Sequence, residues 1–298
     1  MKIAAASCCK LQHFASQPVW EQIRAEQPDA LILLGDNIYL DHDFHSDPKK
    51  LAAELRSLYE QQKAEPHFAA LLADMAARGK PVMAIYDDHD FLGNDRFGGG
   101  ENRALCEAAR QELVTAFRPL QTGDDVYSRR RLGDPGAEVE VIVLDARFYR
   151  RKITDSLFDR DAMLGANQWA WLEKAVDAAR DVPYLLIVSS TTVYSYGLVE
   201  DAWERSPAAF KRLCELFGKR RGALVVSGDI HSNDRYDDAG LVEFVTSGVA
   251  RRGLVFGKPR ANYAIFKFGP QDLRVEQRGL KSSDCWTGVL PLNHWQLP

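Results

Sequence analysis

The sequence predicts an α/β fold in which two β-sheets pack against each other and helices cover them on the outside. Strand-like apolar runs alternate with helical stretches as far as Arg221, and a series of strand-like runs without helices follows. The alternation is typical of a mostly parallel sheet, and the late series predicts a second sheet that is partly antiparallel. Because no repeat, low-complexity tract or long Pro/Ser linker interrupts the chain, we expect residues 1–298 to form a single domain with a short aromatic C-terminal tail.

The first half of the chain contains three apolar runs and three helical patterns. Leu, Ala, Glu and Lys recur at helical spacing from Lys49 to Met75, where Pro66 marks a break because proline lacks the backbone N–H that a helix interior needs. Strands are expected at 2–7 (KIAAAS), 29–36 (DALILLGD) and 81–90 (PVMAIYDDHD), and helices at 19–27, 49–75 and 102–117.

The second half adds two amphipathic helices and most of the strands. The helices are expected at 167–180 and 208–221, and Gly222 is placed to cap the second, because glycine readily adopts the conformation that ends a helix. Strands are expected at 126–132 (VYSRRRL), 138–147 (EVEVIVLDAR), 182–193 (VPYLLIVSSTTV), 223–231 (ALVVSGDIH), 241–249 (LVEFVTSGV), 262–269 (NYAIFKFG) and 272–279 (DLRVEQRG).

Composition and charge argue against several classes of protein. A formal net charge of −4 gives no general basic field, so nucleic acid is expected only as a diester substrate. No run of 18 apolar residues is present, so no membrane span is expected. The N-terminal MKIAAASCCKLQHF has too short an apolar stretch for a signal peptide, which favours a cytoplasmic location. Five cysteines without regular spacing argue against a disulfide framework.

Acidic residues and histidines follow four of the apolar strands. In open α/β sheets, ligands bind beyond the carboxyl ends of the strands, so these side chains are expected to converge in one crevice. The four strand ends carry Gly35-Asp36, Asp87-Asp88-His89-Asp90, Asp145, and Gly228-Asp229-Ile230-His231.

Carboxylates that converge raise one another's pKa unless a cation neutralises them. Asp and His together suit Fe, Mn, Zn, Mg or Ca. Two metals about 3.5–4 Å apart that share a carboxylate form a binuclear site, in which a metal-bound hydroxide attacks phosphorus. Taken singly, the motifs also fit structural roles: a turn at Gly35-Asp36, a helix N-cap at Asp145 and a structural histidine at His231.

Several segments resemble a known group of enzymes. GDNIY at 35–39, DDHD at 87–90 and SGDIH at 227–231 resemble the sequence blocks of the metallophosphoesterases. SC at 7–8, LDARFYR at 144–150, LGANQWAWLE at 164–173 and EFVTSGV at 243–249 are similar to the alkaline phosphatase D (PhoD-like) branch. The resemblance covers about Ser7 to Gly248. It implies a four-layer α/β/β/α sandwich of the calcineurin-like kind and a metal-dependent phosphoesterase.

The resemblance also implies a role for each matched residue. Asp36 would bridge two metals. His89 would act as an acid/base group near the leaving group without binding a metal, and Arg147 would steady the phosphate. The other metal ligands would be Cys8 as a thiolate, Tyr39 as a phenolate as in purple acid phosphatases, and His231 on the first metal, with Asp88 and Asp229 on the second.

Iron with calcium is the composition that the resemblance suggests, and manganese, zinc or magnesium also suit the ligands. Thiolate and phenolate donors favour a trivalent or soft ion over magnesium. Cys9 stands where the branch usually has a polar residue, and since neighbours in a strand point to opposite faces, only one of Cys8 and Cys9 can face the metals. The sequence shows neither the export leader nor the N-terminal β domain of many branch members, so extracellular phosphate scavenging is not expected.

The expected reaction is hydrolysis of a small phosphate ester, either a monoester or a diester. The sequence leaves two other functions open: a catalytically weak regulatory protein that binds metal and phosphate, and a thiol-redox protein that uses Cys8 and Cys9. The glycine-rich segment Asn94–Arg103 could grip phosphate or be an ordinary surface loop. The tail from Ser282 onward could cover the crevice or, as we favour, pack on the domain.

Overall fold

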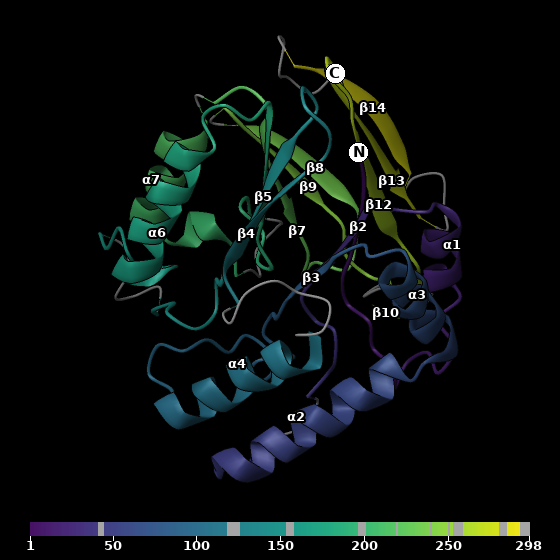
Figure 1. The fold of residues 1–298 in the computed structure, drawn as a ribbon. Coiled ribbons are helices and arrows are strands. Elements are labelled where there is room, and N and C mark those ends of the chain that lie inside the picture. Colours follow the sequence, from purple (N-terminus) through teal and green to yellow (C-terminus); the bar gives the residue numbers. More distant parts are fainter. Residues whose placement is uncertain are drawn as a thin grey trace.

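Two six-stranded sheets lie face to face, with helices outside them, in the computed structural model of the chain (Figure 1). The predicted four-layer α/β/β/α sandwich is therefore confirmed. The structure describes residues 1–40, 45–117, 126–152, 158–195, 201–218, 220–238, 240–249, 251–252, 259–279 and 285–292.

The first sheet joins the N-terminal strands to the C-terminal ones. Its strands are β1 (Lys2–Ala6), β2 (Ala30–Leu34), β3 (Val82–Ile85), β12 (Tyr263–Phe268), β13 (Asp272–Arg278) and β14 (Trp286–Pro291). Their order is β14–β13–β12–β1–β2–β3. β1, β2 and β3 run parallel, whereas β12 pairs antiparallel with the other side of β1.

The second sheet has a parallel centre and antiparallel edges. Its strands are β4 (Ser128–Leu132), β5 (Val139–Val143), β6 (Tyr184–Val188), β7 (Ala223–Ser227), β8 (Asp234–Asp238) and β9 (Leu241–Val245), in the order β4–β5–β6–β7–β9–β8. β5, β6, β7 and β9 run parallel, so their carboxyl ends share one edge. β10 (Arg251–Arg252) and β11 (Pro259–Arg260) form a separate two-stranded pair.

Both faces of the central strands are buried. Tyr184, Leu186 and Val188 of β6 belong to the core between the sheets, whereas Leu185 and Ile187 pack in the core under the outer helices. Because successive side chains of a strand point to opposite faces, a strand that is covered on both sides needs apolar residues at every position. This explains the continuous apolar runs of the sequence.

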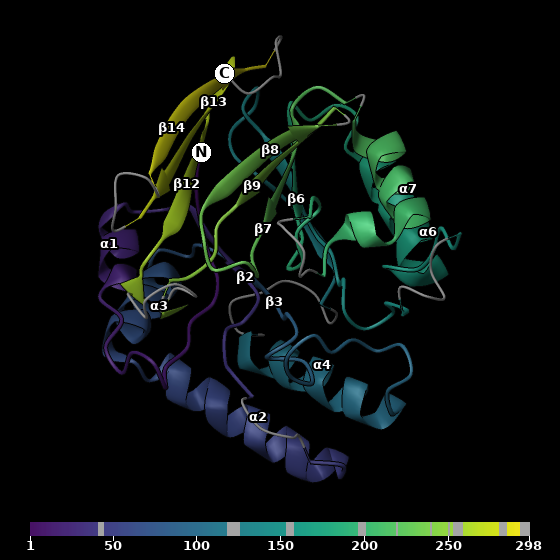
Figure 2. The same cartoon turned by 180° about the vertical axis from the view of Figure 1, so that it is seen from behind.

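The helices form two groups. They are α1 (Val19–Ala25), α2 (Pro48–Lys63), α3 (Pro66–Ala77), α4 (Arg103–Phe117), α6 (Gly165–Ala178) and α7 (Pro207–Phe217), with a 3-10 turn η1 (Trp203–Arg205). Both views place α6 and α7 outside the second sheet and α2 beside α4 below the sheets (Figure 2). The rings of Trp20 and Phe68, 4.5 Å apart, join α1 to α3. None of the described helices is long and apolar enough to cross a membrane.

Three features of the elements differ from the prediction. α7 ends at Phe217 rather than Arg221, with Gly218 and not Gly222 at its C-cap, and Arg220 beyond it donates to the carbonyl oxygens of Ala179 and Val182. The late strands do not make a sheet of their own: β9 extends the second sheet, and β12, β13 and β14 extend the first. β8 and β14 are edge strands that the sequence pattern does not reveal. β14 packs the described part of the tail on the first sheet, while residues 293–298 lie outside the described residues.

Glu243 of β9 is a buried carboxylate that joins three segments. It accepts hydrogen bonds from Ser227 Oγ at 2.6 Å and from the backbone N–H groups of Val193 at 2.7 Å and Tyr194 at 3.0 Å. The segment after β6 is thereby tied to β7 and β9.

We expect Glu243 to lower the stability of the protein as the pH rises. Burial raises its pKa from 4.5 to about 7, so the folded state binds this proton more tightly than the unfolded state. The contribution of Glu243 to the free energy of unfolding is complete below pH 4.5. This contribution, roughly 3 kcal/mol, is lost as the pH rises through about 7. Urea unfolding at about pH 5 and pH 8 checks this prediction. Between these pH values, the free energy of unfolding of wild type should fall by roughly 3 kcal/mol more than that of Glu243→Gln. Equal decreases in the two proteins would contradict the prediction.

Candidate metal centre

Strand ends from both sheets meet at one edge of the sandwich. Cys8 follows β1, Asp36 follows β2, Asp88 follows β3 and Asp229 follows β7. Cys8, Asp36 and Asp88 are at most 4% exposed. Parallel strands end at a common edge, which explains how four distant segments deliver polar side chains to one buried place.

Among the residues that the structure describes, the potential ligand atoms form three overlapping groups, each with its atoms within 4.8 Å of one another. Asp36 belongs to the first two groups, and Asp88 belongs to the last two. The groups are Cys8–Asp36–His231, Asp36–Asp88–His89 and Asp87–Asp88–Asp229. Asp36 therefore links the group that contains a thiol and an imidazole, through Asp88, to the all-carboxylate group.

Four of these residues have left-handed backbone conformations. The φ angles are 61° for Cys8, 52° for Asp36, 73° for Asp229 and 56° for His231. Residues other than glycine rarely adopt this region, and such strain is found most often at functional sites. In this protein, the left-handed conformation directs each of the four side chains away from its strand and into the shared cluster.

The carboxylates carry unfavourable mutual charge. Burial raises the pKa of Asp36 well above its usual value, and the charges of Asp88 and Asp87 raise it further. Burial and the neighbouring charges of Asp87 and Asp88 act in the same way on the pKa of Asp229. For Asp88, burial is outweighed by Arg147, His89 and hydrogen bonds from backbone N–H groups, so its pKa is lowered.

The donor set fits metal ions. Asp36 Oδ1 is buried and has no hydrogen-bond partner among the described residues, although Oδ2 accepts from Tyr39. A buried carboxylate oxygen without a partner is costly unless a cation binds it. Cys8, Asp36 and His231 could hold one ion, and a second could be held in the Asp36–Asp88–His89 group or the Asp87–Asp88–Asp229 group.

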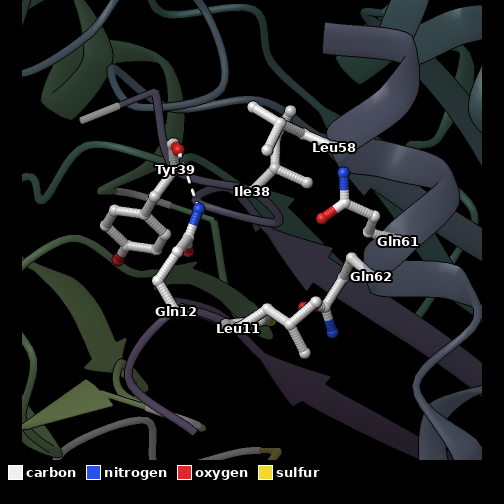
Figure 3. A pocket seen from close by; sticks show the side chains of 8 residues that line it. Leu11, Gln12, Ile38, Tyr39, Leu58, Gln61 and Gln62 are labelled. Atoms are coloured by element: carbon white, nitrogen blue, oxygen red, sulfur yellow. Dashed lines mark hydrogen bonds between the residues drawn. The ribbon is translucent and has the colours of Figure 1, made fainter. Parts of the chain in front are cut away.

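Tyr39 lies beside the shared carboxylate. Its hydroxyl donates to Asp36 Oδ2 at 2.7 Å, its ring centroid is 4.3 Å from that of His89, and Lys10 Nζ lies 5.0 Å from its ring centroid. On the backbone side of Tyr39, a small pocket of about 150 Å³ is lined by aliphatic side chains and three glutamines (Figure 3). The phenol points away from this pocket.

Cys8 and Cys9 point in different directions. Cys8 Sγ lies 3.0 Å from Ser247 Oγ and 3.5 Å from Asp36 Oδ2, whereas Cys9 lines the pocket of Figure 3 and belongs to the apolar core. Both are free thiols. Only Cys8 is therefore placed to bind a metal at the cluster, and the divergence of the two side chains disfavours a thiol-redox pair.

The family model for PhoD-like phosphatases matches residues 3–267 of the chain. The chain belongs to the PhoD-like phosphatase family. It is a metal-dependent phosphoric ester hydrolase. The comparison with curated proteins gave no match.

Solved structures share the fold of this PhoD-like phosphatase. The structure of PhoD has a TM-score of 0.71 at 16% identity and covers 99% of this chain and 71% of that one. GAP50, the anchor in the inner membrane complex of Plasmodium, has a TM-score of 0.61 at 13% identity, with coverages of 98% and 88%. Purple acid phosphatase PPD1 from yellow lupin (Lupinus luteus) seeds has a TM-score of 0.63 at 12% identity, with coverages of 98% and 53%.

Arg147 of this PhoD-like phosphatase is fully buried beside the carboxylates. Its Nε donates to Asp87 Oδ1 at 2.5 Å, and its Nη1 contacts Asp201. Asp87 thereby links the arginine to the carboxylate group that contains Asp88 and Asp229. Neither Asp87 nor Asp201 was expected to have a role. The place of Asp87 in DDHD is a signal that could have indicated one, whereas no sequence pattern indicates Asp201.

Asp145 follows β5 but does not enter any of the three ligand groups found among the described residues. Its Oδ1 accepts from the backbone N–H groups of Arg147 at 3.1 Å and Phe148 at 3.0 Å, and its Oδ2 accepts from Tyr86 OH at 2.5 Å. Asp145 therefore shapes the turn that presents Arg147.

Asp90 fixes the positions of the ligand-bearing turns. It accepts hydrogen bonds from the backbone N–H groups of Asp36 at 3.2 Å, Asn37 at 2.9 Å and Asp87 at 2.5 Å. Burial raises its pKa to about 7. The turns after β2 and β3 thus share one buried carboxylate, a role that the sequence analysis missed.

Ser247 connects two of the three residues of the first group. Its hydroxyl lies 3.0 Å from Cys8 Sγ and accepts from the backbone N–H of His231 at 2.8 Å. The resemblance of EFVTSGV implies no role for its serine, which contacts both Cys8 and His231.

The glycine-rich segment packs against the Arg147 turn instead of forming a free loop. A Cβ on Gly98 would lie 1.9 Å from the carbonyl oxygen of Phe148, and one on Gly99 would lie 2.5 Å from that of Arg150. Gly98 N–H also donates to the carbonyl of Arg147 at 2.8 Å. This segment therefore supports the arginines through its backbone.

Proposed function

We propose that this protein hydrolyses small phosphate esters at a binuclear metal centre whose shared ligand is Asp36. The position of Asp36 in both the Cys8–Asp36–His231 and the Asp36–Asp88–His89 groups carries the proposal. The bound metals supply the activated water and neutralise charge on the phosphoryl oxygens.

The two sides of the cluster favour different ions. The first side offers the Cys8 thiol, the Tyr39 phenol and His231, which are donors that suit iron or zinc. The second offers the carboxylates of Asp88 and Asp229, which suit calcium, magnesium or manganese. We therefore propose iron on the first side and calcium on the second.

Two further residues act on the substrate in this proposal. Arg147 is held at Nε and Nη1 by carboxylates, which leaves Nη2 to donate to a phosphoryl oxygen. His89, which is 8% exposed and whose ring is tilted by 40° against that of Tyr39, is placed to give a proton to the leaving oxygen.

An assay with and without chelator tests the proposal. We expect protein purified without chelator to contain two metals per chain and to hydrolyse an aryl phosphate. Prolonged dialysis against chelator should abolish the activity, and iron with calcium should restore it better than magnesium alone. The same series with a bis-aryl phosphate separates monoesterase from diesterase. A metal-replete protein that cleaves neither ester would support the alternative of a binding protein with weak catalysis.

We expect Cys8→Ser and Cys9→Ser to differ in metal content. Cys8→Ser exchanges the thiol 3.5 Å from Asp36 for a hydroxyl that binds soft or trivalent ions less well, so the first metal should be bound at least about tenfold more weakly. Cys9→Ser changes a core thiol that faces away from the cluster and should keep both metals. Metal analysis and thiol titration before and after metal removal check this. Protection of the Cys9 thiol by metal instead would reverse the assignment.

A further inference from the structure

Two arginines share one carboxylate beside the metal centre. Asp201 contacts the guanidinium groups of both Arg147 and Arg150, and its backbone carbonyl also accepts from Arg150 Nη1 at 3.4 Å. The arginine side chains are at most 1% exposed, whereas the Asp201 side chain is 13% exposed. Asp201 therefore separates two buried cations from solvent.

These arginines have more N–H donors than the neighbouring acceptors satisfy. Nη2 of Arg147 and Nε of Arg150 are both buried without a hydrogen-bond acceptor among the described residues. A buried donor without an acceptor costs about 1–3 kcal/mol, and more when the group is charged. A ligand with several acceptor oxygens would remove this cost.

The charge balance also favours another anion. Asp201 provides one negative charge for two guanidinium groups, and the second carboxylate on Arg147, that of Asp87, also belongs to the Asp87–Asp88–Asp229 group. Burial lowers the pKa of Arg150, and the charge of Arg147 adds to this effect, against the opposing charges of Asp201, Asp87 and Asp229. The neighbouring carboxylates thus compensate the Arg150 charge incompletely, whereas for Arg147 burial is outweighed by the carboxylates around it, which raise its pKa.

The arginines are held in place independently of Asp201. The Arg150 guanidinium carbon lies 5.4 Å from the ring centroid of Phe97, and the backbone of this turn packs against Gly98 and Gly99. A site that is already ordered loses little conformational entropy when a ligand binds. The pair would therefore remain in position if Asp201 moved away.

We propose that Arg150, together with Arg147, forms a second anion subsite that takes a second phosphoryl group of the substrate, and that Asp201 occupies this subsite until such a substrate binds. The proposal rests on the proposed function, because the reacting phosphoryl group binds at the metals. A phosphoryl group offers three oxygens where the Asp201 carboxylate offers two, and it carries more negative charge. It can therefore accept from Arg150 Nε and from the Arg147 Nη1 and Arg150 Nη2 groups that Asp201 contacts, while Arg147 Nη2 donates to the reacting phosphoryl group.

Matched nucleotides test the subsite. Adenosine 5′-monophosphate, adenosine 5′-diphosphate and adenosine 3′,5′-bisphosphate share one nucleoside and differ in the second phosphoryl group. With the metal-loaded protein, we expect kcat/KM to be at least about tenfold higher for one of the two-phosphoryl nucleotides than for the monophosphate. A preference for the diphosphate indicates adjacent phosphoryl groups, and a preference for the bisphosphate indicates separate ones. Equal values for all three nucleotides would overturn the proposal.

Three variants assign the effect to the arginine pair. Arg150→Gln should lower kcat/KM for the preferred two-phosphoryl nucleotide about tenfold more than for the monophosphate. Asp201→Asn retains both arginines and should lower the KM for the two-phosphoryl nucleotide. Arg151→Gln is the control, because Arg151 is 57% exposed and pairs with Asp159 at 2.7 Å. A selectivity unchanged by Asp201→Asn would contradict the role of Asp201 even if Arg150→Gln fails to fold.

Failure of the proposed function gives a different result. A metal-loaded protein that cleaves none of the three nucleotides would contradict phosphate-ester hydrolysis but would leave the subsite testable by equilibrium dialysis. Tighter binding of adenosine 5′-diphosphate or of the bisphosphate than of the monophosphate, lost in Arg150→Gln and kept in Arg151→Gln, would support the subsite. Equal binding of all three would exclude it.

Discussion

Replacing Asp36 with asparagine is expected to lower kcat/KM for phosphate esters by at least about a thousandfold, or ~4 kcal/mol of transition-state stabilisation. In the proposed site, Asp36 is the only ligand common to both metals. Asparagine keeps one oxygen but carries no charge, so it cannot bridge two cations as a carboxylate does. Metal content should fall from two ions to one or fewer per chain, as metal analysis of the purified variant will show.

The same variant should fold. Asp36 has φ 52°, and asparagine tolerates this left-handed conformation better than most residues. The charges of Asp88, Asp87 and Asp90 also destabilise the ionised carboxylate of Asp36. The metal-free variant should therefore be at least as stable as metal-free wild type. Loss of activity caused by unfolding would show instead as a lowered thermal midpoint without metal.

Asp145→Asn provides the matched control for a carboxylate at a strand end. Asp145 accepts from the backbone of its own turn and belongs to none of the three ligand groups. We expect this variant to keep both metals, even if a shifted Arg147 slows turnover. Full activity and two metals in Asp36→Asn would contradict the proposed bridging role.

The strands of the parallel cores could be predicted because both their faces are buried. ALILL at 30–34 and YLLIV at 184–188 are apolar at every position, which leaves little choice of structure. β8 could not be found in this way, since DRYDD is charged and lies at an edge, where pairing to β9 rather than burial fixes it. Sheet membership was also beyond the sequence, because β12 pairs with β1 across more than 250 residues.

The candidate ligands could be predicted because each follows a strand within a few residues. The supporting residues could not. Asp201 lies 54 residues from Arg147 in the chain and 3-10 and helical elements follow it, so no periodic pattern connects the two. Asp87 and Asp88 are adjacent residues of the same type. Only the fold determines that Asp87 accepts a hydrogen bond from Arg147, while Asp88 belongs to a ligand group with Asp36.

Gly35→Ala is expected to destabilise the protein by about 3–5 kcal/mol. Gly35 has φ 99°, and a Cβ there would lie 2.6 Å from Asp87 Cβ and 2.8 Å from the backbone nitrogen of Asp87. Neither atom belongs to a flexible side-chain end, so the turns after β2 and β3 would have to separate. Denaturant unfolding of the metal-free protein measures the loss.

Gly136→Ala separates this clash from backbone strain. Gly136 has φ 87°, close to that of Gly35, but a Cβ there would meet nothing within 4 Å. Its substitution should cost only about 1–2 kcal/mol, the price of a left-handed alanine. Similar losses in the two variants would show that the contact with Asp87 is unimportant.

The Gly35 substitution should also weaken metal binding, because stability and ligation depend on the same contact. The Gly35 carbonyl accepts from Cys8 N–H at 3.3 Å, and Asp90 joins Asp36 to Asp87, so a displaced Gly35 moves ligands on both sides of Asp36. Ligands that bind only the folded state stabilise it in proportion to their affinity. Added metal should therefore raise the unfolding midpoint of wild type and Gly136→Ala by a similar amount, and that of Gly35→Ala by clearly less. An equal increase in all three proteins would mean that the tight turn at Gly35 serves the fold and not the metal centre.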